Sequence, residues 1–331
     1  MSAAIPSTLP QRIFATATSL FPVPLTAFSI ACLIVVYGAI RIPGGYDGTG
    51  GLNVTFGLLG VVWALGFATR CASPRSKSAA VTEGLALFIA LSLVGSMATA
   101  SLVLGSGSYI DPVLAAIDRA ILPFVDWREM VLKLPEYPRL QGLLGQFYVA
   151  LNWQVFLFFG VALVAGRQRD MEALLTALSA GLLICILPFH WLPALGPYPY
   201  FDLRSIDIPG SPVALPWESV SKIEGLRSGA IDTISADVVS GLVAIPSFHA
   251  CSAVIFGWAF WRYRLLRWPM LMINALMFIA AVPIGGHYFI DVVVGGAVGA
   301  LAILPARVLE RRRVEENAPQ EREISSQPAV A

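Results

Sequence analysis

The stretch WPMLMINALMFIAAVPIGGHYFIDVVVGGAVGALAILPA, residues 268–306, contains Asp291 as its one charged side chain. The run before Asp291 exceeds the ~20 residues that an α-helix needs to cross a hydrocarbon core of about 30 Å. The run after it reaches that length only if its helix begins near His287. The stretch therefore predicts two spanning helices joined by a tight turn at Gly285-Gly286, with Asp291 inside the membrane protein.

The rest of the chain has the same character. Of its 331 residues, 56% are hydrophobic and only 13% are charged, and the mean hydropathy is +0.73. These values are far from those of a soluble domain. Long charge-free runs recur along the sequence, so we predict an all-α, polytopic integral membrane helix bundle of about eight transmembrane helices. Their approximate ranges are 20–41, 52–70, 82–104, 146–166, 173–195, 246–263, 268–285 and 287–307.

Basic residues gather in every second connection between these helices. They occur within 70–77, 167–169, 262–267 and 307–313. Because cytoplasmic loops carry an excess of Lys and Arg, we predict that both termini and these loops are cytoplasmic. The remaining connections, which include the long segments 105–145 and 196–245, then face the opposite side. We expect that side to be the periplasm of a bacterial inner membrane.

Two of the three histidines begin predicted spanning helices on that outer side. His249 ends the run Pro246-Ser247-Phe248-His249, and His287 follows the glycine turn, with Asp291 four residues later. An ionisable residue in a membrane segment indicates a functional site, because its burial is costly. Two imidazoles and a carboxylate are sufficient for nucleophilic and acid–base chemistry on a phosphate ester. We expect the third histidine, His190, to be an interhelical hydrogen-bonding residue instead.

The local sequence also favours binding of an anion. Helix N-termini present unpaired N–H groups and the positive end of the helix dipole. Ser247 adds a hydroxyl donor, and Gly286 allows close approach of a ligand to the backbone. Of the two loop cations before the Pro-Ser-Phe-His run, we expect Arg227 to hold the phosphate and Lys222 to matter less, since a guanidinium binds two oxygens at once.

At these residues the chain resembles the type 2 phosphatidic acid phosphatase superfamily. The family motif Pro-Ser-x-His is matched by Pro246, Ser247 and His249, and the motif His-x-x-x-Asp is matched by His287 and Asp291. In that family the histidine of the latter motif attacks phosphorus and the other histidine protonates the leaving oxygen. The resemblance therefore implies that His287 is the nucleophile, with Asp291 as its orienting partner and His249 as the general acid.

The run GGHYFIDVVVG, residues 285–295, is similar to the branch that includes inositol phosphorylceramide synthase. Two departures from the family pattern also fit a transferase branch. Ala281 stands six residues before His287, where the family usually has an arginine, and the usual Lys and Arg-Pro motif is absent. The resemblance implies a lipid phosphate or phospholipid substrate in the bilayer, and an alcohol as a possible acceptor in place of water.

We expect four parts in the chain: a cytoplasmic N-terminal segment, 1–19; N-terminal transmembrane helices with an interfacial segment, 20–145; a phosphatase-like catalytic core, 146–310; and a disordered cytoplasmic tail, 311–331. Within the second part, 111–134 has helical apolar spacing with a break near Pro123. It suits a helix in the interface plane. A plain cover for the bundle is the interpretation we favour over lipid recognition.

Other function classes find less support. A net charge of +1 gives no argument for a nucleic-acid partner. The four cysteines are isolated, which supports neither a disulfide framework nor a zinc site, and we expect no metal and no cofactor. A transporter, or a lipid-binding protein with a non-catalytic version of the fold, remains the alternative, although no inverted repeat is evident. An intramembrane serine protease is a third class, but the expected Gly-x-Ser-x-Gly context is absent around Ser247.

Overall fold

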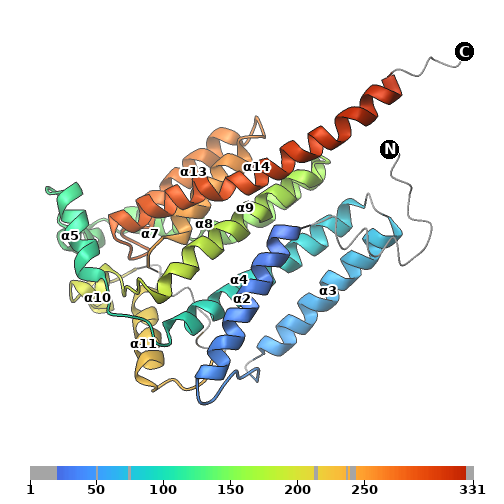
Figure 1. The fold of residues 1–331 in the computed structure, drawn as a ribbon. Helices are drawn as coiled ribbons and strands as arrows, with labels where there is room; N and C mark the ends of the chain where they lie inside the picture. The colour runs from blue at the N-terminus through green and yellow to red at the C-terminus, as the bar shows by residue number, and fades with distance from the viewer. Residues whose placement is uncertain are drawn as a thin grey trace, which may run out of the picture.

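The structure is a computed structural model that describes residues 21–49, 51–73, 76–211, 215–235, 238 and 244–325, with backbone only for Leu215 and 313–325. Helices dominate this part of the chain, and its only extended pairing is an isolated bridge between Tyr46 and Ile234. The predicted all-α membrane bundle is confirmed (Figure 1).

Each predicted spanning segment within the described residues corresponds to a helix. Five helices are long and apolar enough to cross a membrane. They are α2 (Pro22–Arg41), α3 (Leu52–Ala72), α4 (Lys77–Val103), α9 (Gln168–Ile186) and α14 (Phe289–Ser325). A sixth span forms if α7 (Pro138–Tyr148) and α8 (Ala150–Val164), which are bent by 47°, act together. The apolar helices α12 (Phe248–Phe260) and α13 (Arg267–Ala280) are shorter, so the count of eight spans stays a prediction.

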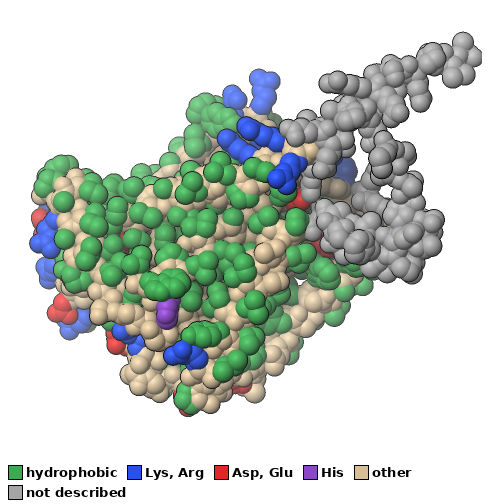
Figure 2. All heavy atoms as spheres, in the orientation of Figure 1, with side chains coloured by type: hydrophobic (Ala, Val, Ile, Leu, Met, Phe, Trp, Pro, Cys, Tyr) green, Lys and Arg blue, Asp and Glu red, His purple; other side chains and the backbone are tan. Residues whose placement is uncertain are grey.

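Helix α9 lies at the centre of the bundle. It packs against α14 and α12 on one side and against α4 and α2 on the other (Figure 1). The largest buried cluster is built around it and includes Phe158, Leu174 and Phe256. Hydrophobic side chains cover the visible face, and Lys and Arg gather toward its ends (Figure 2). This distribution is the one expected of a surface that faces lipid chains in its middle and water at both ends.

Close packing of α12 on α14 fixes the relative position of the two histidine segments. A Cβ atom on Gly295 or Gly299 would collide with the backbone of Ser247 or Cys251. Small residues allow two backbones to approach in this way inside a membrane. Gly295 and Gly299 therefore serve helix packing, and Cys251 is a buried core residue.

At the end of the bundle that lies away from the two histidine segments, buried charged side chains form ion pairs. Arg70 and Glu83 join α3 to α4 at 2.7 Å, with 6% and 1% of their side chains exposed. Arg262, in the turn between α12 and α13, contacts Asp170 of α9 at 3.0 Å and Glu310 of α14 at 2.6 Å. The first pair joins α3 to α4, and the second group joins the turn after α12 to α9 and α14. Removal of one partner of a buried pair would leave an uncompensated buried charge.

Two element boundaries differ from the sequence prediction. Helix α14 begins at Phe289 rather than at His287, because residues 281–286 form turns and Gly286 has a φ of +68°. The same helix continues to Ser325, whereas the sequence predicted disorder in 311–331. Glu, Arg and Gln, which recur in this segment, are good helix formers, and residues 326–331 lie outside the described part.

Segment 111–134 forms two short helices, α5 (Asp111–Ile121) and α6 (Trp127–Leu132). The predicted break near Pro123 is confirmed. Figure 1 shows α5 at the end of the bundle where α14 begins, near α10 (Pro197–Tyr200) and α11 (Leu215–Ser228). Contacts of α5 with α14 and α10 place this segment directly over the predicted site.

Candidate active site

His249 lies in the first turn of α12. Ser247 is the N-cap residue, and its hydroxyl oxygen accepts a hydrogen bond from the Ala250 N–H at 3.4 Å. The N–H groups of Phe248 and His249 lie in the first turn, where helix geometry supplies no intrahelical acceptor. The Ser247 N–H donates to the carbonyl of Asp291 at 3.1 Å, which ties the start of α12 to the first turn of α14.

His287 and Asp291 face each other across the start of α14. The Nδ1 atom of His287 is 3.6 Å from Oδ2 of Asp291, and the Asp291 side chain is completely buried. Because the helix begins at Phe289, Asp291 lies in its first turn, where its carboxylate also accepts the Tyr288 N–H at 2.9 Å. The two side chains come close across a helix cap rather than along one helix face, at a distance longer than a hydrogen bond. The orienting role of Asp291 stays a prediction.

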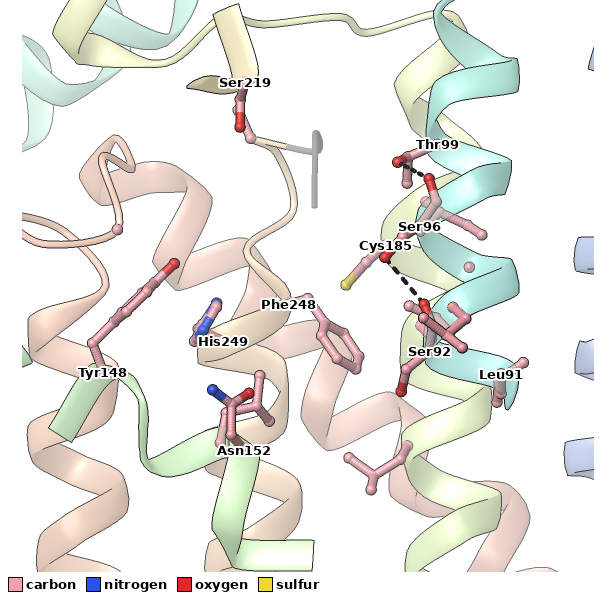
Figure 3. Close-up of a pocket in the computed structure, with 18 of the residues that line it drawn as sticks. Leu91, Ser92, Ser96, Thr99, Tyr148, Asn152, Cys185, Ser219, Phe248 and His249 are labelled. Atoms are coloured by element: carbon pink, nitrogen blue, oxygen red, sulfur yellow. Dashed lines mark hydrogen bonds between the residues drawn. The ribbon is translucent and has the colours of Figure 1, made fainter. Parts of the chain in front are cut away.

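Tyr148, at the end of α7, stacks on the imidazole of His249. The ring centroids are 3.9 Å apart and the ring planes differ by 15°. Figure 3 shows the two rings side by side on one wall of a cavity. Sequence reasoning missed this contact, because it depends on the 47° bend between α7 and α8 that brings Tyr148 toward α12.

Side chains of α5 and α6 form hydrogen bonds with the backbone of residues 287–290. The Asp118 carboxylate accepts the N–H groups of Phe289 and Ile290 at 2.7 and 2.9 Å. The indole N–H of Trp127 donates to the carbonyl of His287 at 3.2 Å. Burial raises the pKa of the Asp118 carboxyl, and its two backbone donors oppose that shift. The sequence signal was present, since an acidic and an aromatic residue interrupt the apolar spacing of 111–134, but their partners were not apparent.

Asp111 extends this support to the loop after α9. Its carboxylate accepts the N–H groups of Leu195 and Gly196 at 3.0 and 2.8 Å, and the hydroxyl of Tyr288 at 3.1 Å. Burial raises the pKa of the Asp111 carboxyl, while these donors lower it. The residue therefore links the 195–196 turn to the segment that contains His287.

These hydrogen bonds alter one sequence prediction. The sequence suggested that the N-termini of both histidine helices converge on one anion. At α14, however, the N–H groups of Tyr288, Phe289 and Ile290 already bond to the carboxylates of Asp291 and Asp118. Two carboxylates at a helix N-terminus satisfy its dipole and repel a further anion. In the glycine turn, the N–H groups of Gly285 and His287 also donate to carbonyls, those of Ala280 and Val282. The prediction of an anion site is thereby narrowed to the first turn of α12 and to Gly286.

Both histidines line one cavity of about 490 Å³. His249, Gly285, Gly286 and His287 form one end of it. Its other walls are mostly apolar and come from α4, α8 and α9, including Phe88, Leu91, Ser92, Leu151, Leu178 and Leu182. Figure 3 shows Phe248 between His249 and the hydroxyl-bearing face of α4. An apolar cavity that ends at two imidazoles suits a lipid that carries a phosphate.

The predicted phosphate-binding residues are not all brought together. Gly286 lines the cavity, whereas the Ser247 hydroxyl caps α12. The Arg227 guanidinium donates to Ser106 and Gly107 at 2.8 Å and lies 4.4 Å from the Tyr109 ring centroid. Among the described residues that line the cavity, none is Lys or Arg.

Lys222 occupies a different position on the same helix. It lies one turn after Ser219, which lines the cavity from α11 (Figure 3). Residues three apart on a helix share a face. The remaining histidine, His190, places its Nδ1 atom 3.0 Å from the carbonyl of Leu102, which confirms its predicted role in joining helices.

The fold and the site define a class of protein: a helical membrane protein with a paired-histidine site at one end of an apolar cavity. Residues 113–305 match the model of the PAP2 superfamily, the type 2 phosphatidic acid phosphatases, and the chain belongs to that superfamily. Its membership indicates phosphatase-type activity. No curated protein and no solved structure matches the chain. The helices α2, α3 and α4 precede the matched region, and α4 nevertheless forms one wall of the cavity.

Proposed function

We propose that this protein is an integral membrane lipid-phosphate phosphatase or phosphotransferase that works through a phosphohistidine on His287. The observation that carries this proposal is the arrangement of His249 and His287 on one cavity, with Asp291 3.6 Å from the Nδ1 atom of His287. A nucleophile that is oriented by a third group, next to an acid, is the usual arrangement for covalent catalysis.

The proposed reaction begins with a neutral His287 and a protonated His249. A proton on Nδ1 of His287 faces the Asp291 carboxylate, which leaves the lone pair on Nε2 free to attack phosphorus. As the N–P bond forms, the bond from phosphorus to the lipid oxygen breaks, and protonated His249 delivers its proton to that oxygen. In the second half, His249 removes a proton from water or an alcohol, whose oxygen then displaces His287 from phosphorus.

The cavity supports a lipid as the substrate. It is lined largely by aliphatic and aromatic side chains, most of them from α4, α8 and α9. The span from Phe88 to Thr99 along α4 is ~16 Å, from the rise of 1.5 Å per residue. This length accommodates much of an acyl chain while the phosphate lies at the histidine end. Apolar walls with a few convergent polar groups are typical of ligand sites.

For the phosphate itself, we propose the first-turn N–H groups of α12 and the backbone at Gly286 as neutral donors. We propose Lys222 as the cation, because it shares a helix face with the cavity-lining Ser219. The position of Arg227 does not favour the clamp expected from the sequence, since its guanidinium binds the 106–109 segment. From the basic loops described above, we propose that the site lies on the outer face, in the periplasm of a bacterial inner membrane.

A trapping experiment tests the mechanism. Purified protein is incubated with a lipid phosphate labelled at phosphorus and then quenched. We expect label that is stable in base, labile in acid and absent from His287→Ala. Label that persists in this variant would remove His287 from the nucleophile role. A screen of lipid phosphates and phosphodiesters, with and without inositol or glycerol, then separates a phosphatase, which releases phosphate, from a transferase, which forms a new phosphodiester lipid.

A further inference from the structure

We propose that α5 and α6 form a clamp that is seated on the phospholipid bilayer surface and positions His287 for attack. This inference rests on the proposed function and adds to it the residues and the partner that control the nucleophile. Two faces of the same short segment carry it. One face binds the backbone of the catalytic loop, and the other exposes large apolar side chains.

The inner face contacts the segment on both sides of the imidazole. Asp118 binds the N–H groups of Phe289 and Ile290, directly after His287, and Trp127 binds the carbonyl of His287 itself. A carboxylate that accepts backbone N–H groups makes strong, charge-assisted hydrogen bonds. The loop before His287 has turn hydrogen bonds of its own, from the N–H groups of Gly285 and His287 to the carbonyls of Ala280 and Val282. The clamp adds contacts to the carbonyl of His287 and to the N–H groups that follow it. The position of His287 therefore depends on the clamp as well as on the turn.

Packing holds Trp127 in the orientation that this contact requires. Its indole stacks on Phe201 at 5.6 Å between centroids and meets the edge of Tyr198 at 5.1 Å. The Tyr198 hydroxyl in turn donates to the carbonyl of Pro283, at the start of the loop. Aromatic rings fixed in this way transmit a displacement of α6 to the loop rather than absorbing it, because packed interiors deform little.

The outer face of the segment exposes large apolar side chains as well as charged ones. Phe124 is 83% exposed, Val113 is 56% exposed and Ile121 is 48% exposed. Arg119 and Arg128 lie beside them on the exposed surface. The segment lies where the spanning helix α14 begins, which is the level of the membrane surface. Exposed apolar residues with flanking basic residues are the composition of an interfacial helix, so the occupant of this face is the phospholipid bilayer.

The inner face is tested with the nearly isosteric Asp118→Asn and with Trp127→Phe, which removes the indole N–H and keeps an aromatic ring. Phosphoenzyme formation is measured with two lipid phosphates that differ in leaving-group pKa. We expect both variants to slow it about 10-fold to 10²-fold, as for a misplaced reacting group, equally for both substrates and with KM unchanged. Loss of the general acid would instead slow the poorer leaving group more. Glu129→Gln on the exposed side of α6 is the control and should behave as the wild type.

The outer face is tested with Ile121→Ser/Phe124→Ser, assayed in detergent and in vesicles of zwitterionic phospholipid. We expect a several-fold loss of turnover in vesicles and little loss in detergent, whereas Ile206→Ser, at a site that is 75% exposed outside the clamp, should lose nothing. Equal turnover of this double variant and wild type in vesicles, or wild-type phosphoenzyme rates in both inner-face variants, would overturn the proposal. A wild-type protein that forms no phosphoenzyme would instead refute the proposed function.

Discussion

Replacement of Asp291 by Asn should separate activity from stability. The Asp291 side chain is fully buried, and its Oδ1 atom has no hydrogen bond within the described part of the protein. An amide oxygen can still accept the Tyr288 N–H, so the cap of α14 survives the change. What disappears is the negative charge 3.6 Å from the Nδ1 atom of His287.

The distance sets the expected size of the effect. At an effective dielectric constant of about 20, unit charges 3.6 Å apart interact by about 4–5 kcal/mol. During attack, positive charge develops on the His287 imidazole, so this interaction stabilises the transition state more than the ground state. Part of it is lost to relaxation of the site, and we expect phosphoenzyme formation to slow by about 10²–10³-fold, where each factor of ten corresponds to about 1.4 kcal/mol.

The free energy of unfolding of Asp291→Asn should rise or stay unchanged, although its activity falls. A buried carboxylate without full compensation costs free energy, and a neutral isostere removes that cost. The assay is rapid-quench trapping of the phosphoenzyme, combined with thermal unfolding of the same preparations. Asp202→Asn is the matched control, because Asp202 is exposed with a positive φ that Asn tolerates. Trapping rates within threefold of wild type in Asp291→Asn would refute the orienting role of this carboxylate.

Three further predictions concern the cation, the topology and the bundle. Lys222→Ala should lower turnover at least tenfold, whereas Arg227→Lys should chiefly lower the melting temperature; the reverse pattern in steady-state kinetics would return the clamp to Arg227. In a cysteine-free background, an impermeant thiol reagent on intact cells should label Ser205→Cys but not Leu265→Cys, and labelling of only the latter would invert the topology. Glu83→Gln should destabilise the protein by about 3–5 kcal/mol, because its ion-pair partner stays buried, and denaturant titration in detergent measures this loss.

Composition and local patterns were sufficient to predict the membrane bundle and the acid–base residues. Charge-free runs marked the helices, because a hydrocarbon environment excludes unpaired charges and unsatisfied backbone groups over a known thickness. The same exclusion made His249, His287 and Asp291 conspicuous, since an ionisable side chain in an apolar run needs a reason. These inferences depend on residue type and spacing alone, and both are properties of the sequence.

Only the tertiary structure decided which groups act on those residues. Tyr148 reaches His249 because two helices bend at their junction, and Asp118 reaches the start of α14 across 171 residues of chain. The contacts of Arg227 with the 106–109 segment likewise join residues that are distant in sequence. Contacts of this kind depend on the packing of whole helices, so no local pattern specifies them. The sequence determined where we propose the chemistry, and the packing decided how the proposed nucleophile is held.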